Sequence, residues 1–153
     1  LQPVTHVSWF AARYFCNALG KRLPSEAEWE KAARAGDEKL YSFGDDPAFL
    51  MDYGWYRKNA TTTRPVAELM PSPLELFDMH GNAREWVWDW YESYASNPAP
   101  DPLGPQQGKY RVLRGGSWKD GPEQLRSASR DDASPAQTAA DIGFRCASDQ
   151  RPE

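Results

Sequence analysis

The sequence predicts a loop-rich α+β domain with two helices near its start and short antiparallel strands in its second half. Helical spacing of apolar residues occurs in two segments, and both lie within the first 36 residues. The 153 residues include 13 prolines and 11 glycines, and the mean hydropathy is −0.78, as expected for many turns and a polar surface. Aromatic residues make up 13% of the chain, which is enough to anchor the core of one domain of this length.

The first predicted helix covers residues 9–19. Ser8 is placed to cap its N-terminus, apolar residues recur at positions 9, 12, 15, 16 and 19, and Gly20 supplies a left-handed C-terminal stop. A short strand is predicted just before it, over residues 4–8. His6 lies in that strand, where we expect a hydrogen-bonded core residue rather than a metal ligand.

The second predicted helix begins with a capping box. Ser25 is the expected N-cap, Glu28 reaches back to it, and Gly36 ends the helix. Residues 37–73 then lose all periodicity and are rich in turn residues. We expect an ordered loop region there, because a flexible linker would not carry its aromatic residues, which are Tyr41, Phe43, Tyr53, Trp55 and Tyr56.

The second half of the chain is predicted to alternate strands and loops. Short β patterns occur over residues 109–118, 125–130 and 142–147, and the first of them ends in a Gly-Gly pair. Residues 97–105 form a proline-rich surface loop in this prediction. The other two loops, residues 119–124 and 131–141, contain mostly small and polar side chains.

Residues 76–90 have the most unusual composition in the chain. Asp78 and Glu85 flank a Gly-Asn turn, and carboxylates with backbone carbonyls are the ligands that calcium takes in irregular loops. Trp86, Trp88 and Trp90 alternate, so their rings share one face if the backbone is extended. Two interpretations are open on these residues alone: a metal-bound turn beside an aromatic wall, or core tryptophans with carboxylates that serve as turn and cap residues.

The charge pattern and known motifs exclude several classes of function. The net charge is −4, the isoelectric point is about 5.3 and no basic run occurs, so nucleic acid and anionic membranes are poor partners. No apolar stretch is long enough to span a bilayer. We find no Walker loop, dinucleotide fingerprint, nucleophile elbow or zinc spacing. The abrupt start at Leu1 looks like the interior of a longer protein, so a targeting signal could precede it.

The chain contains two cysteines, Cys16 and Cys146, near its opposite ends. A bridge between them would close almost the whole chain into one loop. Two buried free thiols explain the same positions equally well on the residues alone.

Five motifs, in this order, resemble the formylglycine-generating enzyme (sulfatase-modifying factor) family. They are residues 3–9 (PVTHVSW), 20–30 (GKRLPSEAEWE), 78–86 (DMHGNAREW), 111–118 (RVLRGGSW) and 143–147 (GFRCA). The resemblance implies a C-type-lectin-related α+β fold with little regular secondary structure. It also implies that residues 1–153 are the C-terminal portion of a single domain, whose N-terminal portion would lie upstream of Leu1, complete the sheet and pack against this chain.

The resemblance also implies a calcium site and a disulfide. The family's central calcium ligands match the side chains of Asp78 and Glu85 and the backbone carbonyls of Gly81 and Ala83. Cys16 and Cys146 match two family positions that form a disulfide in the secretory enzyme, which implies an oxidising or thermophilic setting and favours an extracytoplasmic location (periplasmic, secreted or in the secretory pathway). The second disulfide of that enzyme matches positions 33 and 127, where neither residue is a cysteine.

The family's catalytic chemistry is not expected here. Formylglycine generation requires two cysteines after the Gly-Gly-Ser motif, because paired thiolates bind copper(I). This chain has no cysteine in that region, and Asp120 and Glu123 lie near the vacant positions. Because carboxylates do not replace thiolates toward a soft metal, we do not expect the chain to oxidise sulfatase cysteines.

Three hypotheses about function remain. The first is a calcium-stabilised domain that binds a protein or small molecule through its C-terminal loops. The second is a divergent oxidoreductase of the family that acts in peptide or sulfur-compound maturation. The third is a variable protein of a diversity-generating retroelement with a hypervariable C-terminal surface. The predicted binding surface consists of Trp118, Lys119, Asp120, Glu123, Arg126, Arg130, Asp131, Asp132, Ser134, Thr138 and Asp141.

Overall fold

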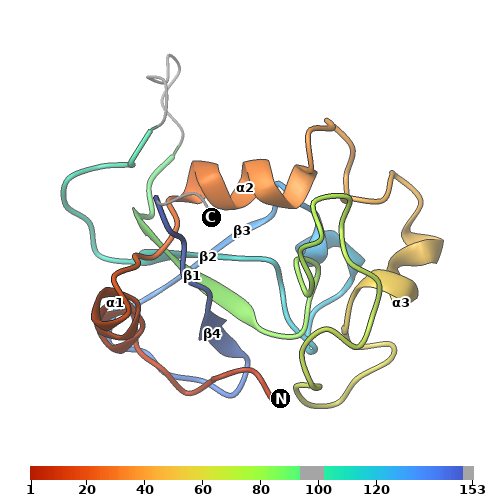
Figure 1. Ribbon diagram of the computed structural model, residues 1–153, viewed down its shortest axis with the longest axis horizontal. Helices are drawn as coiled ribbons and strands as arrows, with labels where there is room; N and C mark the ends of the chain where they lie inside the picture. Colours follow the sequence, from red (N-terminus) through yellow and green to blue (C-terminus); the bar gives the residue numbers. More distant parts are fainter. Residues whose placement is uncertain (94–101, 150–153) are drawn as a thin grey trace.

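A computed structural model describes residues 1–93 and 102–149 (Figure 1). Short helices and one four-stranded sheet are joined by long loops. The helices are α1 (Trp9–Ala18), α2 (Glu26–Arg34) and α3 (Leu50–Tyr53), with 3₁₀ turns η1 (Pro47–Phe49) and η2 (Pro122–Leu125). The strands are β1 (Arg84–Trp90), β2 (Arg111–Arg114), β3 (Arg130–Ala133) and β4 (Ile142–Phe144).

Both predicted helices are confirmed, with their caps. The Ser8 hydroxyl accepts a hydrogen bond from the backbone N–H of Ala11 at 3.2 Å. At the start of α2, the Ser25 hydroxyl accepts from the N–H of Glu28, and the Glu28 carboxylate accepts from the N–H of Ser25 at 2.8 Å. This reciprocal pair is the predicted capping box.

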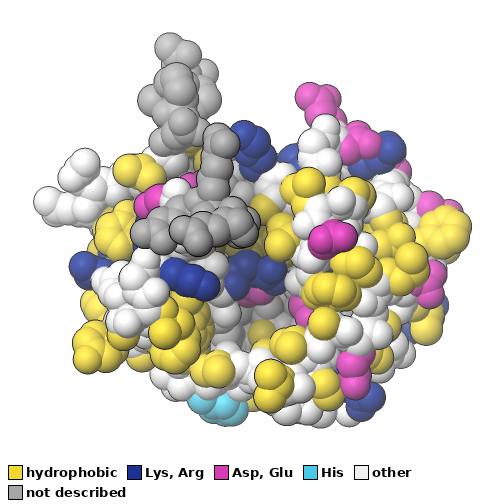
Figure 2. Space-filling model, viewed as in Figure 1, with side chains coloured by type: hydrophobic (Ala, Val, Ile, Leu, Met, Phe, Trp, Pro, Cys, Tyr) yellow, Lys and Arg dark blue, Asp and Glu magenta, His cyan; other side chains and the backbone are white. Residues whose placement is uncertain are grey.

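Two apolar residues of the predicted first helix are more exposed than expected. Apolar residues 9, 12 and 16 are buried, but Phe15 and Leu19 are 51% and 57% exposed. Helical geometry explains this, because residues 15 and 19 lie on the flank of the stripe and the sheet covers only its centre. Hydrophobic side chains accordingly gather on the surface over α1, at the lower left of Figure 2.

The sheet has the strand order β3-β2-β1-β4. Pairings β1–β2 and β2–β3 are antiparallel, as expected, whereas β1 and β4 are parallel, with Arg84 opposite Ile142. The alternating tryptophans, Trp86, Trp88 and Trp90, lie in the central strand β1, so this segment is extended. Its register is interrupted between Trp86 and Trp90, where pairing with β2 is irregular.

Side chains alternate across β1 and β2, so the sheet has a core on each face. On one face Trp86 and Leu113 pack with Trp9 of α1. On the other face Val87 and Val112 pack with Trp29 of α2. A third cluster (Tyr41, Leu50, Tyr56 and Leu125, with Phe43 against it) lies within the loop region, as its aromatic content predicted.

Two predicted strands are absent. Residues 4–8 form no strand, because His6 has a left-handed backbone (φ 56°), and its side chain is exposed rather than in the core. Residues 125–130 were predicted as a strand, but Pro122 starts the 3₁₀ turn η2, which ends at Leu125, and a further turn follows. Strand β3 forms instead over part of the predicted loop. Its position at the edge of the sheet tolerates polar side chains.

The remaining strands are shorter than predicted, and β2 and β4 occupy only the middle or start of their patterns. The short helix α3 and turn η1 were not predicted within residues 37–73. Asp46 caps η1 by accepting from the N–H of Ala48 at 2.9 Å, and Pro47 follows it. Most of the predicted proline-rich loop 97–105 lies outside the described residues. No helix in the described part of the chain has the length and apolarity needed to cross a membrane.

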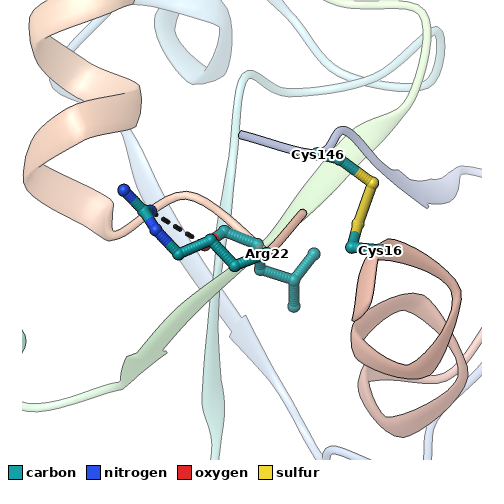
Figure 3. Close-up of a disulfide and its surroundings, with 4 residues drawn as sticks. Cys16, Arg22 and Cys146 are labelled. Atoms are coloured by element: carbon teal, nitrogen blue, oxygen red, sulfur yellow. Dashed lines mark hydrogen bonds between the residues drawn. A yellow bond between two sulfur atoms is a disulfide. The ribbon is translucent and has the colours of Figure 1, made fainter. Parts of the chain in front are cut away.

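Cys16 and Cys146 form the expected disulfide, with their Cα atoms 5.5 Å apart (Figure 3). It joins the end of α1 to the segment just after β4. Next to it, Arg22 and Ala147 exchange two backbone hydrogen bonds, at 3.0 and 2.7 Å. The disulfide and this bridge together fix the C-terminal segment against the loop between α1 and α2.

Candidate functional site

A cavity of about 540 Å³ lies beside the central motif. Its lining includes all four predicted calcium ligands, Asp78, Gly81, Ala83 and Glu85, and also Arg145. The two carboxylates come from the loop before β1 and from β1 itself, whereas Arg145 follows β4. The parallel pairing of β1 with β4 therefore builds this cavity from segments far apart in the sequence.

The loop before β1 is shaped by three residues with positive φ: Asp78 (57°), Gly81 (117°) and Asn82 (65°). A Cβ atom at Gly81 would lie 2.2 Å from the Trp55 carbonyl oxygen, so only glycine fits there. Asn82 is 2% exposed and fixes the turn. Its N–H donates to the Trp55 carbonyl at 2.8 Å, and its side chain exchanges hydrogen bonds with the backbone of Arg64.

Glu85 is a buried carboxylate with strong partners. Arg145 donates to both of its oxygens, at 2.6 and 2.7 Å, and the indole N–H of Trp29 donates at 2.7 Å. Asp78 accepts from the N–H of Ala67 at 2.9 Å and from the Asn82 amide at 3.2 Å. Burial raises the pKa of Asp78, and the charge of Glu85 adds to this, while those hydrogen bonds and Arg145 act in the opposite direction.

These residues fit a hard cation. Arg145 pairs with Glu85, so the partly buried Asp78 has hydrogen-bond donors but no ion-pair partner among the described residues. An ionised carboxylate has about four lone-pair sites, and the hydrogen bonds described use two on Asp78 and three on Glu85. Among the described residues, no group of three or more His, Cys, Asp or Glu side chains is arranged to hold a metal ion, so a metal would also depend on backbone carbonyls.

The predicted C-terminal surface is organised by Arg84, which sequence reasoning missed. This half-buried side chain at the start of β1 forms ion pairs with three carboxylates from different segments: Asp120, Asp131 and Asp141. Lys119 pairs with Asp141 as well, at 2.9 Å. In the sequence, the position of Arg84 shortly after the Gly-Asn turn could have drawn attention to it. The sequence does not show which segments meet at this side chain.

Other predicted surface residues are placed differently. Arg130 points to α2, where it pairs with Glu26 at 2.6 Å. Arg126 donates to the Glu123 carbonyl, so these two lie together along η2. The indole N–H of Trp118 is buried and has no partner within the described chain. Asp132 is half-buried, whereas Ser134 and Thr138 are exposed. The structure thus unites Lys119, Asp120, Asp131 and Asp141 around Arg84. Arg130 lines a small pocket with Asp120 and Asp131, but its ion pair is with Glu26 of α2.

The region expected to replace the catalytic cysteines is occupied by a polar turn. Asp120 accepts hydrogen bonds from the N–H and the hydroxyl of Ser117, at 2.9 and 2.8 Å, besides its ion pair with Arg84. Glu123 is exposed. Both cysteines of the chain are held in the disulfide, so no thiol is available at this turn.

The model of the sulfatase-modifying factor enzyme 1-like domain matches residues 1–150. The chain belongs to this family. A formylglycine-generating enzyme from Streptomyces coelicolor is 38% identical over 168 residues, covering 96% of this chain and 52% of that protein. A relative named serine/threonine-protein kinase Pkn1, from Chlamydia trachomatis, is 44% identical over 153 residues, covering 96% of this chain and 24% of that protein. The chain thus spans between a quarter and about half of these curated relatives.

Solved structures that superpose on this chain confirm the C-type-lectin-related fold. Treponema denticola variable protein 1 superposes with a TM-score of 0.90 and 30% identity, over 94% of this chain and 69% of that one. PvdO from Pseudomonas aeruginosa superposes with a TM-score of 0.83 and 27% identity, over 94% of this chain and 60% of that one. The family fold is therefore shared by proteins whose names indicate different roles.

Proposed function

We propose that the chain is a ligand-binding domain of the sulfatase-modifying factor family that does not generate formylglycine. The observation that carries this proposal is the state of its cysteines. The chain has two, and both are joined in the Cys16–Cys146 disulfide, while the turn after the Gly-Gly-Ser motif holds Asp120 in place of a thiolate. Copper(I) requires soft sulfur ligands, which carboxylates do not supply.

The proposed binding surface is centred on the Arg84 network. Its ion pairs join β1, the turn after β2, β3 and the loop before β4, so four segments are held in one arrangement. Fixed charges at the end of a sheet can orient a polar ligand. Ser134 and Thr138 are exposed, so substitutions there would change contacts with a ligand without disturbing the core. A protein or small-molecule ligand is proposed at this surface.

Calcium is proposed as a structural ion at the cavity beside β1. Asp78 and Glu85 would hold it with their carboxylates, and Gly81 and Ala83 with their carbonyls. A divalent cation there would offset the unpaired negative charge and brace the loop that leads into the central strand. The disulfide supports a location in an oxidising compartment, such as the periplasm or the extracellular space.

An activity assay tests the central claim. The protein is incubated with copper(I), oxygen and a cysteine-containing peptide, with the Streptomyces enzyme as the positive control. We expect mass spectrometry to find the peptide thiol intact in the presence of this chain and converted to an aldehyde by the control. Aldehyde formation by this chain would overturn the proposal.

A retroelement variable protein is the second candidate, favoured by the 0.90 TM-score to Treponema denticola variable protein 1. The exposed loop residues between β3 and β4 have the placement that such diversification needs. A neighbouring reverse transcriptase gene and a template repeat matching the codons for residues 111–146 would establish it. A constant sequence there, in a genome without such a gene, would reject it.

A divergent oxidoreductase for peptide or sulfur-compound maturation is the third candidate, because PvdO shares the fold at a TM-score of 0.83. Such an enzyme would need a redox-active metal or cofactor. Metal analysis of the purified protein, together with oxygen uptake in the presence of iron or copper, separates this candidate from a binding domain. Stoichiometric iron or copper with turnover would favour the enzyme.

A further inference from the structure

A second pocket, of about 300 Å³, is lined by residues 57–64. These residues belong to the loop that follows α3 (Figure 1). Its lining contains three cationic side chains, Arg57, Lys58 and Arg64, and no carboxylate. The hydroxyl-bearing residues Thr61 and Thr62 complete its wall. The chain as a whole carries a net charge of −4, so this pocket opposes the average charge of the molecule.

The loop that forms the pocket is fixed at both ends. At its start, the Asn59 side chain accepts from the N–H of Tyr56 at 2.8 Å and donates to the Gly54 carbonyl at 3.0 Å. At its end, the N–H of Arg64 donates to the buried Asn82 side chain at 3.0 Å, and Asn82 donates back to the Arg64 carbonyl at 3.1 Å. The pocket is therefore anchored to the turn before β1.

Two of the three cations around the pocket, Arg57 and Lys58, form no ion pair with any described residue. The guanidinium of Arg64 lies over the Trp55 ring, 5.1 Å from its centroid, and makes a long ion pair of 3.9 Å with the exposed carboxylate of Glu68. The hydroxyls of Thr61 and Thr62 make no hydrogen bond within residues 1–93 and 102–149. Three like charges around one cavity repel each other, so an anion between them would relieve that repulsion.

Arg57 is positioned by the turn that contains Asp120 and Gly121. The guanidinium of Arg57 lies so close to Gly121 that a Cβ atom there would be 3.0 Å from it. The backbone N–H of Arg57 also donates to the Asp120 carbonyl at 3.1 Å. Arg57 is therefore held against the turn after β2 by its backbone and packs on it with its side chain.

We propose that this pocket binds a tetrahedral oxyanion, a phosphate or sulfate group carried by a larger ligand. Guanidinium groups present paired N–H donors that match two oxygens of such a group, and threonine hydroxyls supply further donors. The cavity is larger than the inorganic ion alone, which leaves space for the organic part of an ester. This site adjoins the Arg84 network at Asp120, but its three cations lie outside that network, and the proposal does not depend on the proposed function.

The test is an NMR titration of the ¹⁵N-labelled chain with inorganic phosphate and, separately, inorganic sulfate at constant ionic strength. We expect saturable shifts confined to the amides of residues 57–64. Arg64→Gln should raise the Kd about tenfold, as expected for the loss of one charge-assisted interaction. Parallel titrations with phenyl phosphate and phenyl sulfate distinguish the two esters, because the favoured one should bind more tightly than its inorganic ion.

Arg13→Gln is the matched control, because it removes the same charge from an exposed residue of α1. We expect it to leave the Kd unchanged. The dispersion of each spectrum reports folding, and Lys58→Gln, at an exposed position, serves as a second variant if Arg64→Gln unfolds. Shifts that fail to saturate, shifts that chloride reproduces, or an equal effect of Arg13→Gln would each overturn the proposal.

Discussion

The hydroxyl of Ser127 donates a hydrogen bond to the backbone carbonyl of Ala33, at 3.5 Å, and both residues are fully buried. These are the two positions that match the second disulfide of the secretory enzyme. They meet in this fold although 94 residues separate them in the sequence. The structure therefore brings these two positions together although neither carries a cysteine in this chain.

The first prediction follows from this contact. The double variant Ala33→Cys, Ser127→Cys should form a second disulfide during oxidative folding and gain about 2–4 kcal/mol in free energy of unfolding. The gain should fall at the lower end, because the Cys16–Cys146 disulfide already restricts the unfolded chain. Denaturation by urea measures the gain, with the two single variants as controls. Free thiols in the oxidised double variant would contradict the prediction.

The second prediction concerns calcium. The effect of one substitution on thermal stability should have opposite signs with and without bound calcium. Glu85→Ala is a poor test, because it also leaves Arg145 buried without its partner, which destabilises with or without a metal. Asp78→Asn is sharper. With calcium present it should lower the melting temperature and abolish stabilisation by added calcium. Without calcium it should be neutral or stabilising, because burial raises the pKa of Asp78 and disfavours its charge.

Thermal denaturation of the wild type and Asp78→Asn, each with excess calcium and with a chelator, measures both signs. Magnesium at the same concentration is the control, because it rarely accepts irregular sites rich in carbonyls. A wild-type melting curve that responds to neither calcium nor chelator would exclude a structural calcium ion at Asp78.

The third prediction is a loss of stability in acid caused by His80. Its ring is buried, its Nε2 accepts from the N–H of Ser42 at 3.0 Å, and its Nδ1 lies 2.8 Å from the Leu125 carbonyl. Burial lowers its pKa from 6.5 to about 4. The unfolded chain therefore binds a proton first, and the contribution of His80 to the free energy of unfolding should fall by about 3 kcal/mol as the pH drops from 6.5 to 4. Urea denaturation of the wild type and of His80→Gln across this pH interval measures the loss. If the free energies of unfolding of the two proteins changed equally with pH, the prediction would be wrong.

The fourth prediction is an opposing effect of Asp89. This carboxylate is 3% exposed and accepts from the N–H of Glu26 at 2.6 Å. Burial raises its pKa from 3.8 to about 6. The stability it contributes is therefore complete below pH 4 and is lost as the pH rises through 6.

Asp89→Asn keeps the acceptor for Glu26 and should stabilise the protein by about 2 kcal/mol at pH 8, but not at pH 4. Denaturation by urea at both pH values tests this. Because Asp89 and His80 act in opposite directions between pH 4 and 6.5, the net loss of stability on acidification should be larger in Asp89→Asn than in the wild type. An equal effect of Asp89→Asn at both pH values would contradict the assignment.

Local signals in the sequence were sufficient for the helices and the central strand. Ser8, Ser25 and Glu28 cap their helices through bonds that span at most three residues, so their roles follow from spacing alone. The alternation in β1 was equally readable, because Trp86 and Val87 must face opposite sides of a strand. The disulfide followed from the family resemblance, since spacing left free thiols equally open.

Contacts between distant segments could not be predicted from the sequence. The parallel pairing of β1 with β4 and the three ion pairs of Arg84 depend on the path of the chain between residues 90 and 142. The edge strand β3 was missed because Asp131 and Asp132 have low strand propensity, which pairing with β2 overrides. His6 was misplaced for a similar reason: its left-handed backbone and its bond to the Ala139 carbonyl are set by the loop before β4.

The bridge between Cys16 and Cys146 makes the polypeptide a nearly closed ring of 130 residues. A protease that cuts one peptide bond inside this ring therefore yields two pieces that stay covalently joined until a reductant is added. On a gel without reductant the nicked molecule keeps its full mass, and its shape can survive, since each new end is still tethered.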